Sequence, residues 1–430
     1  MYLSDFVAVL LVLAAGFSYL NHRLLRLPTT VGLMAGTLLA SLATLIGGLI
    51  FPPLEHQAAA FVRQIDFNQA LLQGMLGFLL FAGALHIDLG DLARQKVAIT
   101  VLATVGVVLF TVLIGGLTWI LFALLGIPVP FVYCLLFGAL ISPTDPIAVL
   151  ALLKQLKAPK ALEVTIAGES LFNDGVGVVL FLGLLEVTIG GHGFDPARLV
   201  LLFLRESVGG TVFGLAAGYL VYRMLKSVDN YHVEILLSLA LVSGGYALAN
   251  ALHLSGPIAM VVAGLIIGNH GRLFALSPTT VHNLDLFWEL IEDVLNAVLF
   301  VLLGLEVLIV TFTSRFLAAG VLAIPIVLLA RLGSAGLPVW LLRRRQPMER
   351  GTVRMLTWGG LRGALSVAMA LSLPRQIEGV AVPERDIILV VTYVVVVFSI
   401  LVQELTIGPL ARRWLAVGDV AAASKVNFRA

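Results

Sequence analysis

The sequence predicts an all-α polytopic membrane protein, and two observations support this fold class. Of the 430 residues, 60% are hydrophobic and only 12% are charged, and the mean hydropathy is +1.04. Soluble globular proteins carry about 25% charged residues. The hydrophobic residues also form runs of roughly 20, the length that an α-helix needs to cross a bilayer. We therefore expect one integral membrane domain over residues 1–430, without a soluble domain.

About thirteen hydrophobic runs follow one another between Leu3 and Val417. The predicted spans cover residues 4–21, 29–50, 68–86, 97–125, 128–153, 162–187, 198–225, 232–252, 255–273, 284–312, 316–342, 352–373 and 386–411. The first run is expected to stay as a helix and not to be cleaved as a signal peptide, because the segment before it has no positive residue and carries Asp5.

The positions of the basic residues predict the orientation in the membrane. Lys and Arg in short loops mark the cytoplasmic side, and 19 of the 27 follow odd-numbered spans, Arg23, Arg26 and Lys154 among them. With an odd number of spans, the N-terminus is expected outside and the C-terminus in the cytoplasm. The net charge of +2 does not indicate a nucleic-acid partner, and the single cysteine, Cys134, cannot form an internal disulfide.

The fifth predicted span cannot be one undisturbed helix, because it contains Pro143 and Pro146. Each proline lacks the N–H group that would bond a carbonyl one turn earlier, at Ala139 and Ser142 respectively. Carbonyl groups freed at this depth need partners, so an unwound crossing normally lines a cavity or a buried site.

Thr144 and Asp145 lie between these prolines and bring a hydroxyl and a carboxylate to the exposed backbone oxygens. Oxygen ligands of this kind suit small hard cations. The alternative is a simple proline kink in which Asp145 caps the second half of the helix.

The sixth predicted span contains the polar stretch GESLFNDGVG, from Gly168 to Gly177. Carboxylates at membrane depth are costly and persist mainly where they face a cavity, a partner or an ion pathway. On a helix, Ser170 and Asp174 share one face, and Glu169 and Asn173 form a second pair about 40° away. The stretch therefore indicates a buried ion site centred on Asp174.

The twelfth predicted span is interrupted as well, by Gly359, Gly360 and Gly363 around the cation of Arg362. Interruptions at corresponding places in two halves are typical of inverted-repeat transporters with a site near the midplane. We therefore expect two six-helix inverted repeats, approximately residues 1–190 and 230–415, with discontinuous helices five and twelve. Glu169 is the expected structural partner of Arg362.

Further acids lie within or near the spans. The tenth span holds Glu289, Glu292, Asp293, Asn296 and Glu306, and we prefer a structural role in which Arg331 balances Glu289 or Asp293 over a role in the ion pathway. His86 is expected at the inner rim, with pH sensing as the alternative. Glu186, Glu234 and Glu404 lie near span ends and are expected at the membrane interface.

Three motifs in this order resemble a known family. They are Thr144-Asp145 in the fifth span, Asn173-Asp174 in the sixth, and the stretch GGLRGA from Gly359 to Ala364 in the twelfth. Together they resemble the monovalent cation/proton antiporters, in the sodium/proton exchanger branch with the asparagine-aspartate signature of prokaryotic type. The resemblance covers essentially the whole chain.

The resemblance implies a homodimer in the bacterial inner membrane, in which a core domain with crossed fifth and twelfth helices moves against a dimerisation domain. It implies that Asp174 carries the ion, with Asn173, Ser170, Thr144 and Asp145 as the other cation-binding residues, and that no cofactor is needed. Asn173 in place of an aspartate implies electroneutral exchange. The sequence departs from many relatives at Ala82, where they carry an acid.

The expected function is exchange of Na⁺ or Li⁺ for H⁺ by competition for Asp174 with alternating access. Burial favours the protonated carboxyl and neighbouring ligands favour the charged form, so one site can hold either ion. K⁺/H⁺ antiport is the alternative within this class. A cation channel would need a filter-like run, which the sequence does not show. An intramembrane protease would use Asp145 and Asp174 as a dyad, but their Pro and Asn neighbours do not favour it.

Overall fold

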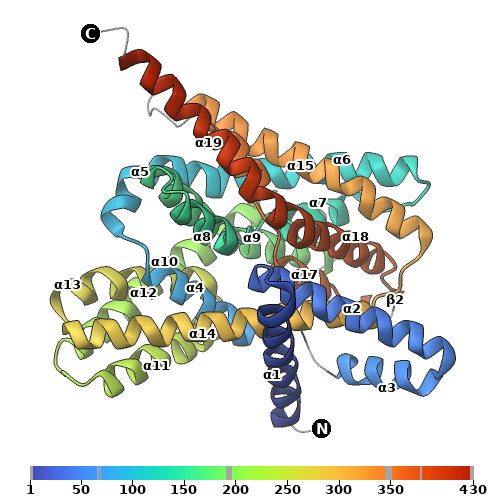
Figure 1. Cartoon of the computed structure of the whole chain (residues 1–430), viewed down its shortest axis with the longest axis horizontal. Helices are drawn as coiled ribbons and strands as arrows, with labels where there is room; N and C mark the ends of the chain where they lie inside the picture. The colour runs from blue at the N-terminus through green and yellow to red at the C-terminus, as the bar shows by residue number, and fades with distance from the viewer. Residues whose placement is uncertain are drawn as a thin grey trace.

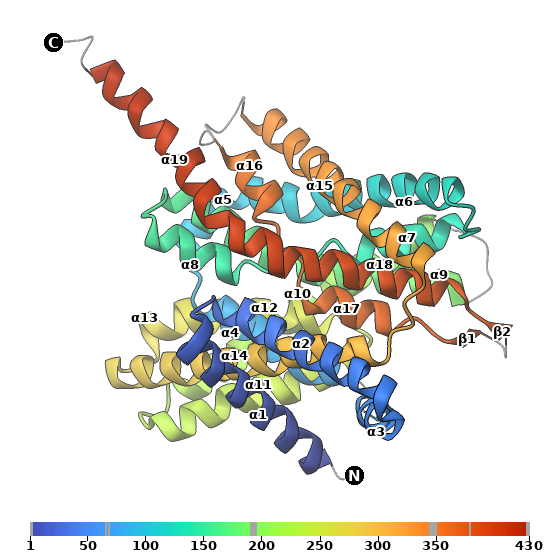
Figure 2. The ribbon, with the colours of Figure 1, turned by 45° about the vertical axis from the view of Figure 1, so that its right-hand side comes forward.

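The computed structural model describes residues 3–64, 67, 69–189, 196–343, 351–377 and 380–426. This part of the chain is almost entirely helical, and its helices lie in two layers (Figures 1 and 2). Layer A contains α1 (Leu3–Leu20), η1 (Asn21–Leu25), α2 (Thr29–Ile50), α3 (Pro52–Arg63), η2 (Gln69–Met75), α4 (Leu76–Leu85), α10 (Pro196–Leu225), α11 (Tyr231–Ala251), α12 (Gly256–Ile266), η4 (Ile267–Gly271), α13 (Arg272–Phe274), α14 (Pro278–Leu305) and η5 (Glu306–Leu308).

Layer B contains α5 (Leu89–Val101), η3 (Leu102–Gly106), α6 (Val107–Leu124), α7 (Phe131–Leu140), α8 (Ile147–Gln155), α9 (Lys160–Ile189), α15 (Ser314–Leu342), α16 (Thr352–Trp358), α17 (Ala364–Leu371), α18 (Glu384–Phe398), η6 (Ser399–Gln403) and α19 (Glu404–Val426). A short hairpin of β1 (Gln376–Ile377) and β2 (Val380–Ala381) precedes α18, with Gln376 opposite Ala381.

Each half of the chain contributes helices to both layers. The first half supplies α1–α4 to layer A and α5–α9 to layer B, and the second half supplies α11–α14 and α15–α19 in the same way. The layers meet where α9 packs against α10 and α12 and where α17 packs against α14. The prediction of an all-helical polytopic protein is confirmed, and this distribution is compatible with paired halves.

Within the described ranges, nine helices are long and apolar enough to cross a membrane. The other four predicted spans are not among these nine, for physical reasons. The third is the short pair η2 and α4, the fifth and twelfth are broken, and the tenth, α14, carries several acids. Large apolar side chains cover the outside, and Leu49 and Leu124 are more than 80% exposed. Such faces suit contact with lipid, because the backbone behind them is already hydrogen-bonded within the helix.

Capping residues set where several helices begin. The side chains of Asp88, Ser255, Ser277 and Thr313 each accept a hydrogen bond from a backbone N–H in the first turn of α5, α12, α14 and α15 respectively. Polar N-caps satisfy N–H groups that have no partner within the helix. These bonds fix where the four helices begin.

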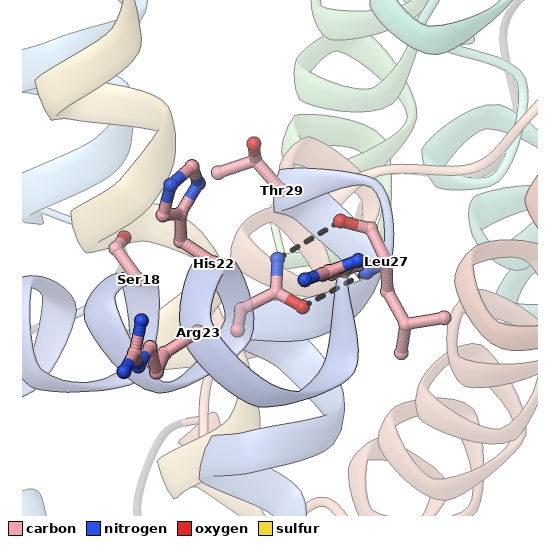
Figure 3. Close-up of a pocket in the computed structure, with 7 residues that line it drawn as sticks. Ser18, His22, Arg23, Leu27 and Thr29 are labelled. Carbon is pink, nitrogen blue, oxygen red and sulfur yellow. Dashed lines mark hydrogen bonds between the residues drawn. The ribbon is translucent and has the colours of Figure 1, made fainter.

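The turn between α1 and α2 is held by one asparagine (Figure 3). The Asn21 amide donates to the Leu27 carbonyl at 2.9 Å and its oxygen accepts from the Leu27 N–H at 3.2 Å. A Cβ at Gly32 would lie 2.2 Å from the Asn21 side chain, so only glycine fits there. A pocket of about 740 Å³ at this turn is lined by His22, Arg23 and neighbouring residues.

The closest helix contact in layer B joins α6 to α7. A Cβ at Gly138 would lie 2.5 Å from the backbone oxygen of Thr111, nearer than real Cβ atoms come to another atom. Gly138 is therefore required for the approach that places α7, and the unwound segment after it, inside the layer.

Candidate cation site

The two interrupted spans meet at their unwound segments. Residues 141–146 separate α7 from α8, and residues 359–363 separate α16 from α17. The Asp145 N–H donates to the Leu361 carbonyl at 2.9 Å, and the two residues form an isolated antiparallel bridge. A Cβ at Gly363 would lie 3.3 Å from the Asp145 side chain, so the glycine permits this close crossing. The interruptions predicted from the prolines and glycines are both present.

The carbonyl groups freed by the two prolines find new partners. The Ala139 carbonyl accepts from the Ser142 N–H at 3.2 Å and from the Ser142 hydroxyl at 2.8 Å. The Ser142 and Pro143 carbonyls accept from Nη1 of Arg362 at 2.7 and 3.0 Å. Buried backbone groups need such partners, so Arg362 stabilises the unwound part of the fifth span from the twelfth.

The expected ion pair between Glu169 and Arg362 is wrong in this structure. Both oxygens of Glu169 accept from Arg331, with each N–O distance 2.9 Å, and Arg331 also donates to the Leu356 carbonyl at 3.1 Å. Arg362 instead donates hydrogen bonds to the carbonyls of the fifth span, and its guanidinium carbon lies 4.6 Å from the centre of the Phe110 ring. A guanidinium has five N–H donors, so carbonyls and an aromatic face can replace a carboxylate.

Asn173 acts as a brace on α9. Its amide nitrogen donates to the Thr144 hydroxyl at 2.8 Å and to Glu169 at 3.0 Å. The Ser170 hydroxyl donates to the Thr144 carbonyl. The polar stretch of the sixth span is therefore hydrogen-bonded to the unwound part of the fifth, and both Ser170 and Asn173 are buried.

A cavity of about 660 Å³ opens at the seam between the layers. Four of the predicted cation-binding residues line it: Thr144, Asp145, Ser170 and Asp174. One oxygen of Asp174 is buried without a hydrogen-bond partner, which leaves an acceptor free for a proton or a cation. Asn173 does not line the cavity, so the structure does not place it as a direct cation ligand.

Asp145 accepts a hydrogen bond at the start of α8 and also lines the cavity. One carboxylate oxygen accepts from the Ile147 N–H at 3.1 Å, as a helix cap does at the start of α8. The same side chain lines the cavity beside Asp174. Capping therefore orients the carboxylate without removing it from the site.

Four polar residues of α14 also line the cavity: Glu289, Glu292, Asp293 and Asn296. Arg331 does not balance them, because it is paired with Glu169 on the far side of the site. The expected balancing by Arg331 is therefore wrong, and the structural role at these positions stays a prediction. Their spacing of three, one and three residues puts all four on one face of a helix, and this was the sequence signal for a shared cavity.

The cavity entrance carries charges of both signs. It is lined by His86, Asp88, Asp91, Lys154, Lys160 and Glu163. Lys154 and Lys160 follow the fifth span, on the side where basic residues predict the cytoplasm. His86 also lines the cavity, with Nε2 at 3.7 Å from a carboxylate oxygen of Asp285, and its place on the cytoplasmic side stays a prediction. Ala82 is fully buried and lies outside the cavity lining, whereas Gly83 lines it.

The donor set suits a small monovalent cation. The cavity lining combines two carboxylates from different spans, Asp145 and Asp174, with two residues that carry hydroxyl groups, Thr144 and Ser170. Within the described part of the chain, no group of three or more His, Cys, Asp or Glu residues could hold a metal ion. The site is therefore chemically suited to a hard ion held by few charges.

Comparison with known proteins agrees with this geometry. Residues 4–413 match the family described as "Sodium/hydrogen exchanger, transmembrane". The chain is 51% identical over 414 residues to the Na⁺/H⁺ antiporter NhaP of Pseudomonas aeruginosa, covering 95% of this chain and 96% of that protein. It is 34% identical over 419 residues to the Na⁺/H⁺ antiporter NhaH of Halobacillus dabanensis, covering 95% and 97%.

The fold resembles that of a solved structure, the sodium proton antiporter MjNhaP1 from Methanocaldococcus jannaschii at pH 8. The TM-score is 0.73 at 21% sequence identity, and the match covers 96% of this chain and 100% of that one. The family match spans nearly the whole sequence, including both broken helices and the α9 motif. The chain therefore belongs to the sodium/hydrogen exchanger family.

Proposed function

We propose that this protein exchanges Na⁺ for H⁺ across the membrane at Asp174. One observation carries the proposal: the Asp174 carboxylate, with a buried oxygen free of partners, lines a cavity together with Asp145 and the Thr144 and Ser170 oxygens. The Na⁺/H⁺ antiporters at 51% and 34% identity support the choice of ions. Li⁺ is a second substrate of the same chemistry.

The two ions compete for one carboxylate. When Asp174 holds a proton or a cation, the site is neutral and can cross with layer B. When it holds neither, its uncompensated charge resists transfer through the apolar seam. Exchange then follows without a chemical energy source, because the site changes sides only when loaded. In this scheme the protein moves ions as a carrier and performs no enzymatic reaction.

The neutral Asn173 supports one-for-one exchange. Glu169 and Arg331 form a pair with no net charge. The Asn173 amide donates a hydrogen bond to Glu169 and has no titratable group. Asp174 is then the titrating group, and a sodium ion that binds there displaces its proton, with Asp145 as a neighbouring ligand. The resemblance to electroneutral relatives leads to the same stoichiometry.

The structure is proposed to represent the state open to the cytoplasm. The cavity opens beside Lys154 and Lys160, and cytoplasmic loops carry an excess of basic residues. The acids of α14 line the same cavity as Asp174 and raise the local cation concentration there. This orientation puts the N-terminus outside and the C-terminus in the cytoplasm of a bacterial inner membrane.

The oligomer and the domain organisation remain proposals as well. We infer a homodimer formed through layer A, and two inverted repeats over approximately residues 1–190 and 230–415. The support for the repeats is the contribution of each half to both layers, and the support for the homodimer is the family resemblance. Layer B, which contains both broken helices, is then the mobile part.

The test is cation-driven proton movement in proteoliposomes that contain wild type, Asp174→Asn or Glu163→Gln. Glu163 is the matched control, because it lies on the same helix and lines the same cavity near its entrance. We expect sodium- and lithium-driven proton flux from wild type and Glu163→Gln, no flux from Asp174→Asn, and no change when potassium and valinomycin clamp the voltage.

The other outcomes are equally informative. A response to potassium alone would replace sodium by potassium and retain the antiport mechanism. Ion flux without proton counterflow would indicate a channel. Normal exchange by folded Asp174→Asn would show that the carrier residue is another group.

A further inference from the structure

A partly buried hydrogen bond between two side chains joins the two layers. The Thr30 hydroxyl, in the first turn of α2 in layer A, donates to Oε1 of Glu404, the first residue of α19 in layer B. Glu404 is only 7% exposed, and its expected place at the membrane interface stays a prediction. A buried carboxylate needs such a donor, and the bond therefore depends on the relative position of the layers.

The turn that precedes Glu404 holds the broken helix of the candidate site. In η6, the Ser399 hydroxyl accepts from the Arg362 N–H at 2.8 Å, and Gln403 donates to the Trp358 carbonyl at 2.9 Å. These two bonds lie at the ends of the unwound segment 359–363, which pairs with Asp145 through Leu361. Glu404 directly follows Gln403 in the chain, and the hydrogen bonds of Gln403 and Ser399 link this turn to the site within layer B.

We propose that Glu404 is a positioning residue for transport, and that its bond to Thr30 holds the layers in the arrangement where the cavity is open beside Lys154. The bond breaks when layer B carries the site to the other side of the membrane, and it forms again on return. This proposal rests on the alternating-access function proposed above. It assigns to Thr30 and Glu404 a conformational role without ion contact, since neither residue lines the cavity.

A matched pair of the same chemistry lies inside layer A. The Thr280 hydroxyl donates to Glu234 at 2.6 Å, and both residues are buried. Thr280 belongs to α14 and Glu234 to α11, so this bond is not stretched when the layers slide. The two threonine–glutamate pairs separate the effect of layer motion from the general effect of losing a buried hydrogen bond.

The first experiment cross-links each pair. In a Cys134→Ala background, Thr30→Cys/Glu404→Cys and Thr280→Cys/Glu234→Cys are bridged with Hg²⁺ in proteoliposomes. We expect the bridge at 30 and 404 to lower exchange at least tenfold, with recovery after a thiol removes the mercury. The bridge at 280 and 234 should leave exchange unchanged. Full exchange by quantitatively bridged 30/404 protein would overturn the proposal.

The second experiment measures the populations without requiring transport. Spin labels at Leu49→Cys in layer A and Leu124→Cys in layer B, both highly exposed positions, report the distance between the layers. Thr30→Val should shift the ratio of the two distance populations about tenfold away from the arrangement seen here, the size expected for one lost bond to a buried carboxylate. Thr30→Ser should restore the ratio, and Thr280→Val should not change it.

The outcomes keep this proposal separate from the proposed function. Unchanged distance populations in Thr30→Val would refute the proposed role of the Thr30–Glu404 bond even if exchange were normal. Absence of any cation/proton exchange in wild type would refute the proposed function, whereas a population shift in the same protein would still support a bond that selects one arrangement of the layers.

Discussion

The ion pair between Glu169 and Arg331 leads to a quantitative prediction for a double-mutant cycle. Both side chains are at most 5% exposed, and they share two N–H···O contacts of 2.9 Å. Removing one member leaves the other charge buried and unpaired, so Glu169→Gln or Arg331→Gln should each lower the free energy of unfolding by about 3–5 kcal/mol. The double variant loses both charges, so its free energy of unfolding should fall by less than the sum of the two single losses. The difference is a coupling energy of roughly 2–3 kcal/mol.

The same cycle with Arg362→Gln is the internal comparison. Arg362 donates to the Ser142 and Pro143 carbonyls instead of to Glu169, so its coupling to Glu169 should not exceed about 1 kcal/mol. The free energies would come from unfolding by SDS titration in mixed micelles, for the wild type, the three single variants and the two double variants. If the coupling of Glu169 to Arg362 were the larger one, the assignment of the ion pair to Arg331 would be incorrect.

Three further predictions follow from the site and its packing. Glu292→Gln should raise the apparent KM for sodium severalfold at low ionic strength. Added choline chloride should reduce the difference in KM between variant and wild type, because screening weakens the field of the cavity acids. An equal effect at all salt concentrations would indicate a role in binding geometry. Because protons and sodium compete for Asp174, raising the pH on the cavity side should lower the apparent KM for sodium, approaching about tenfold per pH unit where the protonated site dominates; a pH-independent KM in transport assays would contradict competition. Gly138→Ala should destabilise the protein by about 1–3 kcal/mol in thermal unfolding, because its Cβ would meet the Thr111 backbone, whereas Gly116→Ala, with no atom within 4 Å of its Cβ, should be nearly neutral.

Local chemistry made several features predictable from the sequence. Pro143 and Pro146 cannot donate the bonds that a continuous helix needs, so the interruption of the fifth span followed from the residues alone. The cost of burying carboxylates in a membrane marked Thr144-Asp145 and Ser170-Asp174 as two candidate sites. Their grouping into one site came from the family resemblance. These four residues do line one cavity.

The choice of partners was not predictable in the same way. Two arginines, Arg331 and Arg362, were available to Glu169, and sequence position could not decide between them because both lie far from it along the chain. The crossing of the broken helices brings Arg362 to the freed carbonyls of the fifth span, and this leaves Arg331 for Glu169. The outcome depends on where three separate helices meet.

The sequence by itself determined the membrane class, the two broken spans and the identity of the carboxylates at the candidate site, because each depends on local hydrophobicity or on the bonding capacity of single residues. Only the tertiary structure decided that α14 contributes its acids to the same cavity, that Asn173 braces Thr144, and that Glu404 contacts Thr30 across the layers. These contacts join residues that are distant in sequence, and the relative placement of whole helices, which no local pattern encodes, selects among the partners that chemistry allows.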